Sequence, residues 1–118
     1  MQSTIGVGVV GFGFMGRTHI AAYEAARKAG FGCELVALCE LSRDRLSTSN
    51  STKGNIQTGA DDADTLFDRQ TVTTYTQIDA FLSDPSVHVV SICTPTDTHV
   101  SLGLKALKAG KHVLIEKP

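Results

Sequence analysis

The sequence predicts an α/β fold built on a doubly wound parallel sheet. Short β-branched runs alternate with helical stretches in the order β α β, loop, β α β α β. Glycine or proline stands at most of the changes from one element to the next. With right-handed crossovers, this alternation gives the strand order 3-2-1-4-5. Residues 1–118 are enough for one domain with a core of its own.

The first strand is predicted over residues 5–10, an apolar β-branched run that stops at a glycine. Gly6 and Gly8 alternate with its valines, and a strand face lined by glycine lets another backbone approach closely. Residues 17–29 are typical of an alanine-rich helix that ends at Gly30, in the usual C′ position. A strand is therefore joined to a helix by a short turn.

That turn fits the pattern G-x-G-x-x-G at Gly11, Gly13 and Gly16. In a dinucleotide site the first glycine permits the tight turn, the second lets a pyrophosphate approach the backbone, and the third lets the helix pack on the strand. The N–H groups and the positive end of the helix dipole then face the phosphates. The pattern predicts a dinucleotide site, and an ordinary glycine-rich turn without a ligand is the alternative.

A second strand is predicted over residues 34–39, with Glu40 at its end. An acidic residue roughly 20 residues after the glycine turn bonds the adenosine ribose hydroxyls, and an arginine nearby can accommodate a 2′-phosphate. Glu40 therefore favours NAD over NADP, whereas Arg43 and Arg45 favour the opposite. In another interpretation, Glu40 caps the next helical turn and the arginines are only solvated.

The rest of the chain continues the alternation after a polar stretch. Residues 42–69 lack a sustained period and are predicted to be largely loop, with a short helix near Phe67 and a hypothetical role as a flap beside the adenine. The strands expected after it cover residues 71–76, 87–93 and 112–115, and a short helical stripe covers residues 78–82. The last helix is predicted to be capped within residues 96–98 and to stop at Gly110. Its apolar residues on one stripe are Val100, Leu104 and Leu107.

Composition excludes several classes of partner. The net charge of −1 gives no reason to expect a nucleic acid or an anionic membrane surface, and no run is long enough to span a membrane. The chain starts without a basic and apolar leader. The three cysteines lack metal-site spacing and lie in or beside predicted strands, so we expect buried thiols, no metal site and a cytoplasmic protein.

Two histidines are expected to be structural. His19 follows the glycine turn by one helical turn and could approach a ligand, but a surface or packing role is favoured. His88 stands at the start of the fourth predicted strand and is interpreted as a strand-entry residue.

Four segments together resemble the N-terminal Rossmann domain of the Gfo/Idh/MocA family, named for glucose–fructose oxidoreductase, inositol 2-dehydrogenase and a rhizopine-catabolism protein. The segments are GFGFMGRTH, ELVALCE, VVSICTPTDTH and ALKAGKHVLIEKP, and only about residues 47–69 fall outside the resemblance. The last segment is the most specific, because its final three residues are the family's signature. The resemblance implies an α/β substrate domain after residue 118 and a homo-oligomeric full-length protein.

The resemblance also implies where a cofactor is held. The positions that match the family's cofactor contacts are Gly11, Gly13, Phe14, Met15 and Gly16 around the pyrophosphate, Glu40 at the adenosine ribose, Thr94, Pro95, Thr96 and His99 on the nicotinamide-ribose side, and Glu116 and Lys117 at the nicotinamide and the substrate.

Lys117 resembles the family's catalytic lysine. An ammonium group there would stabilise negative charge on a substrate oxygen and hold that alcohol beside the hydride acceptor. The alternative is a solvated lysine at a frayed terminus. The implied function is an NAD-dependent oxidoreductase that acts on a secondary hydroxyl of a sugar or cyclitol. A non-catalytic dinucleotide-binding or sensing module, and an NAD-dependent glycosidase of the same family, are the other hypotheses.

Overall fold

The computed structural model describes residues 4–42, 66–68 and 70–118. Five parallel strands form one sheet in the order β3-β2-β1-β4-β5, which confirms the predicted strand order. The elements in these ranges are β1 (Ile5–Val10), α1 (Phe14–Lys28), β2 (Cys33–Cys39), β3 (Thr73–Tyr75), α4 (Ile78–Leu82), β4 (Val89–Ile92), the 3₁₀ turn η1 (Thr96–Thr98), α5 (His99–Lys108) and β5 (His112–Ile115).

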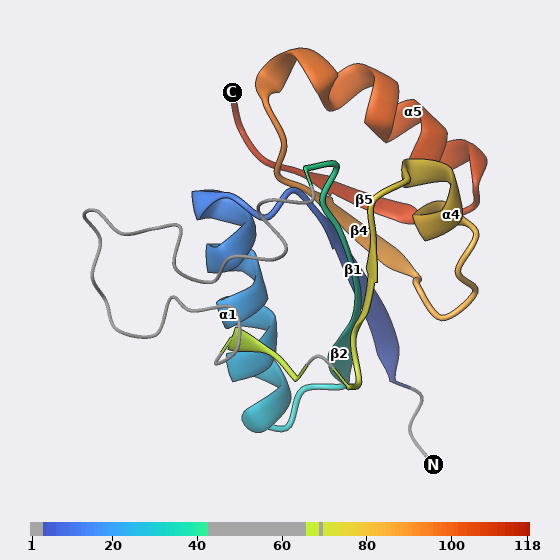
Figure 1. Cartoon of the computed structure of the whole chain (residues 1–118). Helices are drawn as coiled ribbons and strands as arrows, with labels where there is room; N and C mark the ends of the chain where they lie inside the picture. Colours follow the sequence, from blue (N-terminus) through green and yellow to red (C-terminus); the bar gives the residue numbers. More distant parts are fainter. Residues whose placement is uncertain (1–3, 43–65, 69) are drawn as a thin grey trace.

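Helices cover both faces of the sheet, α1 on one face and α4 and α5 on the other (Figure 1). Successive strand residues point to opposite faces. Val9 therefore packs under α1 with Ile20, whereas Val10 packs with Phe81 of α4 and Ala106 of α5. Because helices and apolar side chains cover both faces of the central strands, a ligand is expected at the strand ends.

The glycines of β1 allow close packing, as predicted, but in two different ways. A Cβ on Gly6 would overlap the carbonyl oxygen of Ser86, so here a neighbouring backbone does approach the strand. A Cβ on Gly8 would lie 2.6 Å from the ring of Phe81, so at this position an aromatic side chain occupies the space.

Several boundaries differ from the predicted ones for identifiable reasons. α1 begins at Phe14, inside the glycine turn, and Gly13 is its N-cap residue. β3 and β4 are shorter than predicted because the preceding residues are used in turns. The Val72 N–H donates to the Asp68 carbonyl, and the Val87 N–H donates to the Asp84 carbonyl.

The apolar stripe predicted on α5 faces outward. Small residues, Gly103 and Ala106, face the sheet instead and let the helix pack close to it. β5 pairs only with β4 among the described strands, and its residues Leu114 and Ile115 are also exposed. The stripe itself is 74%, 52% and 58% exposed at Val100, Leu104 and Leu107.

This exposed apolar face, α5 with β5, should make the isolated chain associate at high concentration. We expect Leu104→Lys with Leu114→Lys to reduce that association, measured by sedimentation velocity over a concentration series. Phe31→Lys is the matched control, because Phe31 is 68% exposed but lies in the turn after α1. A wild-type chain that stays monomeric throughout the series would contradict the prediction.

Candidate functional site

A hollow of about 350 Å³ opens outside the carboxyl ends of β1, β2 and β4. Ligands of open parallel sheets bind at such ends, where the strand order reverses direction. In this sheet that point lies between β1 and β4, because β2 and β3 follow on one side of β1 whereas β4 and β5 lie on the other. The residues that line the hollow are Val10, Gly11, Glu40, Leu41, Ser42, Cys93, Thr94, Pro95, Thr98 and Leu102.

The glycine turn is tight enough to require two of its glycines. Gly11 has a φ of 100°, and a Cβ there would lie 2.7 Å from the carbonyl oxygen of Cys93. A Cβ on Gly16 would overlap the carbonyl oxygen of Gly11, so the first turn of α1 rests directly on the glycine turn. Beside them, Phe14 is exposed and Met15 is half-buried. The role of Gly13 toward a pyrophosphate stays a prediction.

Glu40 is buried where β2 meets the glycine turn. Its Oε1 accepts a hydrogen bond from the Phe12 N–H at 2.7 Å, and its Oε2 accepts one from the Ser42 N–H at 2.9 Å. The predicted local cap accounts only for the second bond. The two main-chain hydrogen bonds fix the orientation of the Glu40 carboxylate at the edge of the hollow.

The residues after β4 form a bonded loop. The Thr98 hydroxyl donates to the Pro95 carbonyl at 2.6 Å, and Thr94 Oγ1 lies 2.6 Å from Thr98 Oγ1. Because a hydroxyl has one hydrogen, Thr94 is the donor in this pair. Thr94 also lines the hollow. His99 is buried, and its Nε2 donates a hydrogen bond to the Thr94 carbonyl at 3.0 Å. This bond helps to fix the main chain at Thr94. Thr96 is exposed beside them.

The residues after β5 meet α1. Glu116 Oε2 lies 3.2 Å from His19 Nε2, and Glu116 Oε1 accepts a hydrogen bond from the Lys117 N–H at 3.2 Å. The His19 bond and then the Lys117 bond hold the pKa of Glu116 below its ordinary value. A surface or packing role was favoured for His19, whereas the structure pairs it with a predicted site residue. His88 accepts a hydrogen bond from the Gly6 N–H at the start of β4, where the sequence placed it.

The predicted residues thus gather at one end of the sheet, but not all in one hollow. Gly11, Glu40, Thr94 and Pro95 share the hollow, and the other predicted residues are not among those that line it. Sequence reasoning did not single out several lining residues. Most of them lie within three residues of a predicted strand end, which is the signal that could have identified them: Val10, Leu41, Ser42 and Cys93, with Thr98 and Leu102 further along.

The cysteines near the site are poor nucleophiles. All three cysteines of the chain are free thiols. Burial, with a smaller effect of the neighbouring Glu40 charge, raises the pKa of Cys39 to about 12. Burial and the Glu116 charge raise the pKa of Cys93 to about 12. Both thiols are therefore protonated at neutral pH and do not suit nucleophilic catalysis or metal binding.

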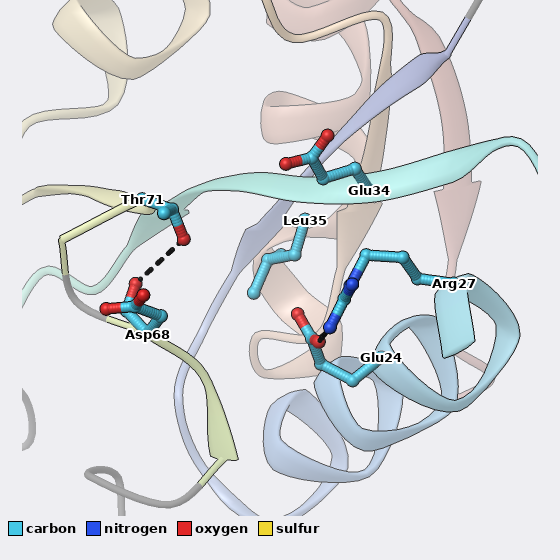
Figure 2. Close-up of a pocket in the computed structure, with 6 residues that line it drawn as sticks. All are labelled: Glu24, Arg27, Glu34, Leu35, Asp68 and Thr71. Atoms are coloured by element: carbon cyan, nitrogen blue, oxygen red, sulfur yellow. Dashed lines mark hydrogen bonds and ion pairs between the residues drawn. The ribbon is translucent and has the colours of Figure 1, made fainter.

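A second, smaller hollow of about 200 Å³ lies between the end of α1 and the start of β2 (Figure 2). Its arginine, Arg27, points to Glu24 and pairs with it at 3.0 Å. Glu34 and Leu35 place this hollow at the amino end of β2, opposite to the end at which parallel sheets bind ligands. It is therefore separate from the candidate site. None of the helices in the described part of the chain combines the length and the apolar character that a membrane span requires.

Comparison with known proteins gives consistent matches. Residues 5–118 match the Gfo/Idh/MocA model, described as oxidoreductase family, NAD-binding Rossmann fold. The uncharacterized oxidoreductase YdgJ of Escherichia coli (strain K12) is 32% identical over 118 residues, which are 100% of this chain and 28% of that protein. Inositol 2-dehydrogenase/D-chiro-inositol 3-dehydrogenase of Lactiplantibacillus plantarum is 30% identical over 112 residues, 95% of this chain and 27% of that protein.

A solved structure agrees in fold and in sequence. Levoglucosan dehydrogenase, in complex with NADH and L-sorbose, matches with a TM-score of 0.71 and 26% identity. The match covers 99% of this chain and 28% of that one. The chain therefore spans a little over a quarter of the length of the proteins it resembles.

Proposed function

Because the chain belongs to the Gfo/Idh/MocA family of oxidoreductases, we propose that it is the NAD-binding domain of a longer dehydrogenase. The observation that carries the proposal is the meeting of Gly11, Glu40 and Thr94 in one hollow outside the strand ends. The names of relatives that act on inositol and levoglucosan support a substrate with a secondary hydroxyl, a sugar or a cyclitol. The chain spans only a little over a quarter of the length of these relatives, which supports a separate substrate domain in the longer protein.

The residues at the site fit a dinucleotide. At Gly11 and Gly16 even a methyl group would overlap or crowd main-chain atoms, so the turn and the first N–H groups of α1 are drawn close together. The first turn of α1 carries no acidic residue that would repel phosphate. Glu40 supplies a carboxylate for ribose hydroxyls. When bound, NAD supplies the nicotinamide carbon that exchanges hydride.

The chain's own residues have distinct tasks in this proposal. Thr94, whose hydroxyl hydrogen is used by Thr98, accepts a hydrogen bond from the nicotinamide side of the ligand. Glu116 and Lys117 follow β5 directly. The Lys117 ammonium stabilises negative charge on the substrate oxygen and holds the alcohol in place.

Cofactor preference follows from Glu40. A buried carboxylate repels the 2′-phosphate of NADP, so NAD is the expected cofactor. Arg43 and Arg45, which could favour NADP, lie outside the described residues, as does most of the proposed adenine flap.

Calorimetric titration of this chain with NAD, and separately with NADP, tests the proposal. We expect NAD to bind and NADP to bind at least about tenfold more weakly, which corresponds to about 1.4 kcal/mol. Glu40→Gln removes the charge but keeps an oxygen for the Phe12 N–H. It should therefore reduce the difference in affinity between NAD and NADP. If NADP bound more tightly than NAD, the result would indicate that Arg43 and Arg45, and not Glu40, determine the cofactor preference. Binding of neither cofactor would contradict a preformed site.

We also propose a cytoplasmic location and a small-molecule substrate. The three free thiols suit a reducing compartment. The slightly negative net charge gives no support for a nucleic-acid partner. A homo-oligomeric full-length protein remains an expectation from the family resemblance.

A further inference from the structure

The Glu116 carboxylate is held from two sides at the end of β5. One oxygen pairs with His19 at 3.2 Å, and the other accepts the Lys117 N–H at 3.2 Å. The His19 and Glu116 side chains are only 16% and 23% exposed. Partial shielding makes such a charge-assisted contact stronger than one on the open surface. A side chain of α1 thus reaches the residue that precedes Lys117.

The His19 ring contacts Tyr23, a second residue of α1 that is itself bonded to the sheet. Tyr23 lies one turn further along α1 on the same face, and its hydroxyl is 2.5 Å from Oγ of the buried Ser91 on β4. The rings of His19 and Tyr23 meet edge to face, with centroids 6.4 Å apart. α1 begins at the carboxyl ends of the strands, where β5 also finishes (Figure 1). The His19–Glu116 contact joins these two segments.

Lys117 depends on the Glu116 carboxylate for its main-chain direction. The Glu116 N–H donates to the Ile92 carbonyl at 3.0 Å and so continues the pairing of β5 with β4 by one residue. The Lys117 N–H bonds the Glu116 side chain instead of a strand. The orientation of that carboxylate therefore influences how the chain leaves the sheet at Lys117.

We propose that His19 is a positioning residue that orients Glu116 and, through its carboxylate, the main chain from which Lys117 reaches the substrate. This inference rests on the proposed function, since it takes Lys117 as the residue that meets the substrate. His19 acts through Glu116 and has no chemical role of its own in the reaction.

A carboxyl NMR titration of the 118-residue chain tests the contact without turnover. His19→Phe keeps a ring but removes the donor, so the pKa of Glu116 should rise toward its ordinary value and the Lys117 amide resonance should shift. His19→Gln keeps a donor and should leave both closer to wild type. His112→Gln, at the exposed start of β5, is the matched control and should change neither. An unchanged Glu116 pKa in His19→Phe overturns the inference, whether or not the chain binds NAD.

Turnover of the full-length enzyme tests the consequence. His19→Phe should lower kcat by about tenfold to a hundredfold and leave the Kd for NAD within about twofold, because slight misplacement of a reacting group costs rate rather than cofactor affinity. His19→Gln should recover part of the loss. Failure of the wild-type enzyme to bind NAD would instead count against the proposed function, because the NMR titration still reports the His19 contact.

Glu116→Gln gives a second route that does not depend on the folding of His19→Phe. It keeps the side-chain volume and should lower kcat to a similar extent. The losses from His19→Phe and Glu116→Gln should not add in the double variant. Glutamine has only one acceptor oxygen for the His19 and Lys117 donors, so Glu116→Gln weakens the same link that His19→Phe breaks. Additive losses, a wild-type kcat in Glu116→Gln, or a fall in NAD affinity equal to the fall in kcat in His19→Phe would each overturn the inference.

Discussion

Replacing Lys117 by alanine in the full-length protein is expected to lower kcat by on the order of a thousandfold while NAD affinity changes by less than about 1 kcal/mol. The reason is that Lys117 is expected to interact with the substrate mainly in the transition state, whereas it contributes little to cofactor binding. Lys117 is exposed at the end of β5, where its ammonium can meet charge that develops on a substrate oxygen. The cofactor contacts that we propose for Gly11 and Glu40 do not depend on that charge.

Steady-state kinetics and a separate NAD titration measure the two quantities. Lys108→Ala is the matched control, because Lys108 is an exposed lysine in the last turn of α5. It should change neither kcat nor the Kd for NAD. Equal loss of turnover and affinity in Lys117→Ala would make Lys117 a binding residue, and no loss of either would favour a dinucleotide-sensing module over a dehydrogenase.

Local patterns were sufficient to predict the framework of this fold. The strand order followed from the alternation of β-branched runs with helices, because right-handed crossovers leave few other arrangements. Gly30 and Gly110 were expected to stop helices, and both have positive φ, which glycine adopts without strain. β5 has the predicted bounds, because a glycine before it and a charged residue after it delimit the apolar run.

Contacts between distant segments were not predictable in the same way. His19 and Glu116 are 97 positions apart, and nothing in either local sequence indicates the other. The apolar stripe on α5 illustrates a second limit. Its large residues were predicted to share one stripe, but the helix presents Gly103 and Ala106 to the sheet, because small side chains permit closer packing. Periodicity identifies a helix face, and only packing decides which face is buried.

Gly16→Ala should have the largest effect on stability of any single methyl group added at the site. The new Cβ would overlap the carbonyl oxygen of Gly11, and that oxygen belongs to a tightly held turn. The Gly11 N–H donates to the Cys39 carbonyl at 2.8 Å, and the Cys93 carbonyl lies against Gly11 from the other side. The turn cannot yield, so α1 must move away from the sheet.

We expect this shift to lower the free energy of unfolding by about 3 kcal/mol, the upper end of the usual cost of overpacking, and to weaken NAD binding by more than about tenfold. Urea denaturation and calorimetry measure the two effects. Gly103→Ala is the matched control, since Gly103 also lies inside a helix but its Cβ would meet only the end of the Ile115 side chain, at 3.2 Å. That flexible end can move, and alanine favours a helix over glycine by about 1 kcal/mol, so Gly103→Ala should be neutral or stabilising. If the two variants behaved alike, α1 could not rest on the glycine turn, and the N–H groups of its first turn would lose the position from which they face a phosphate.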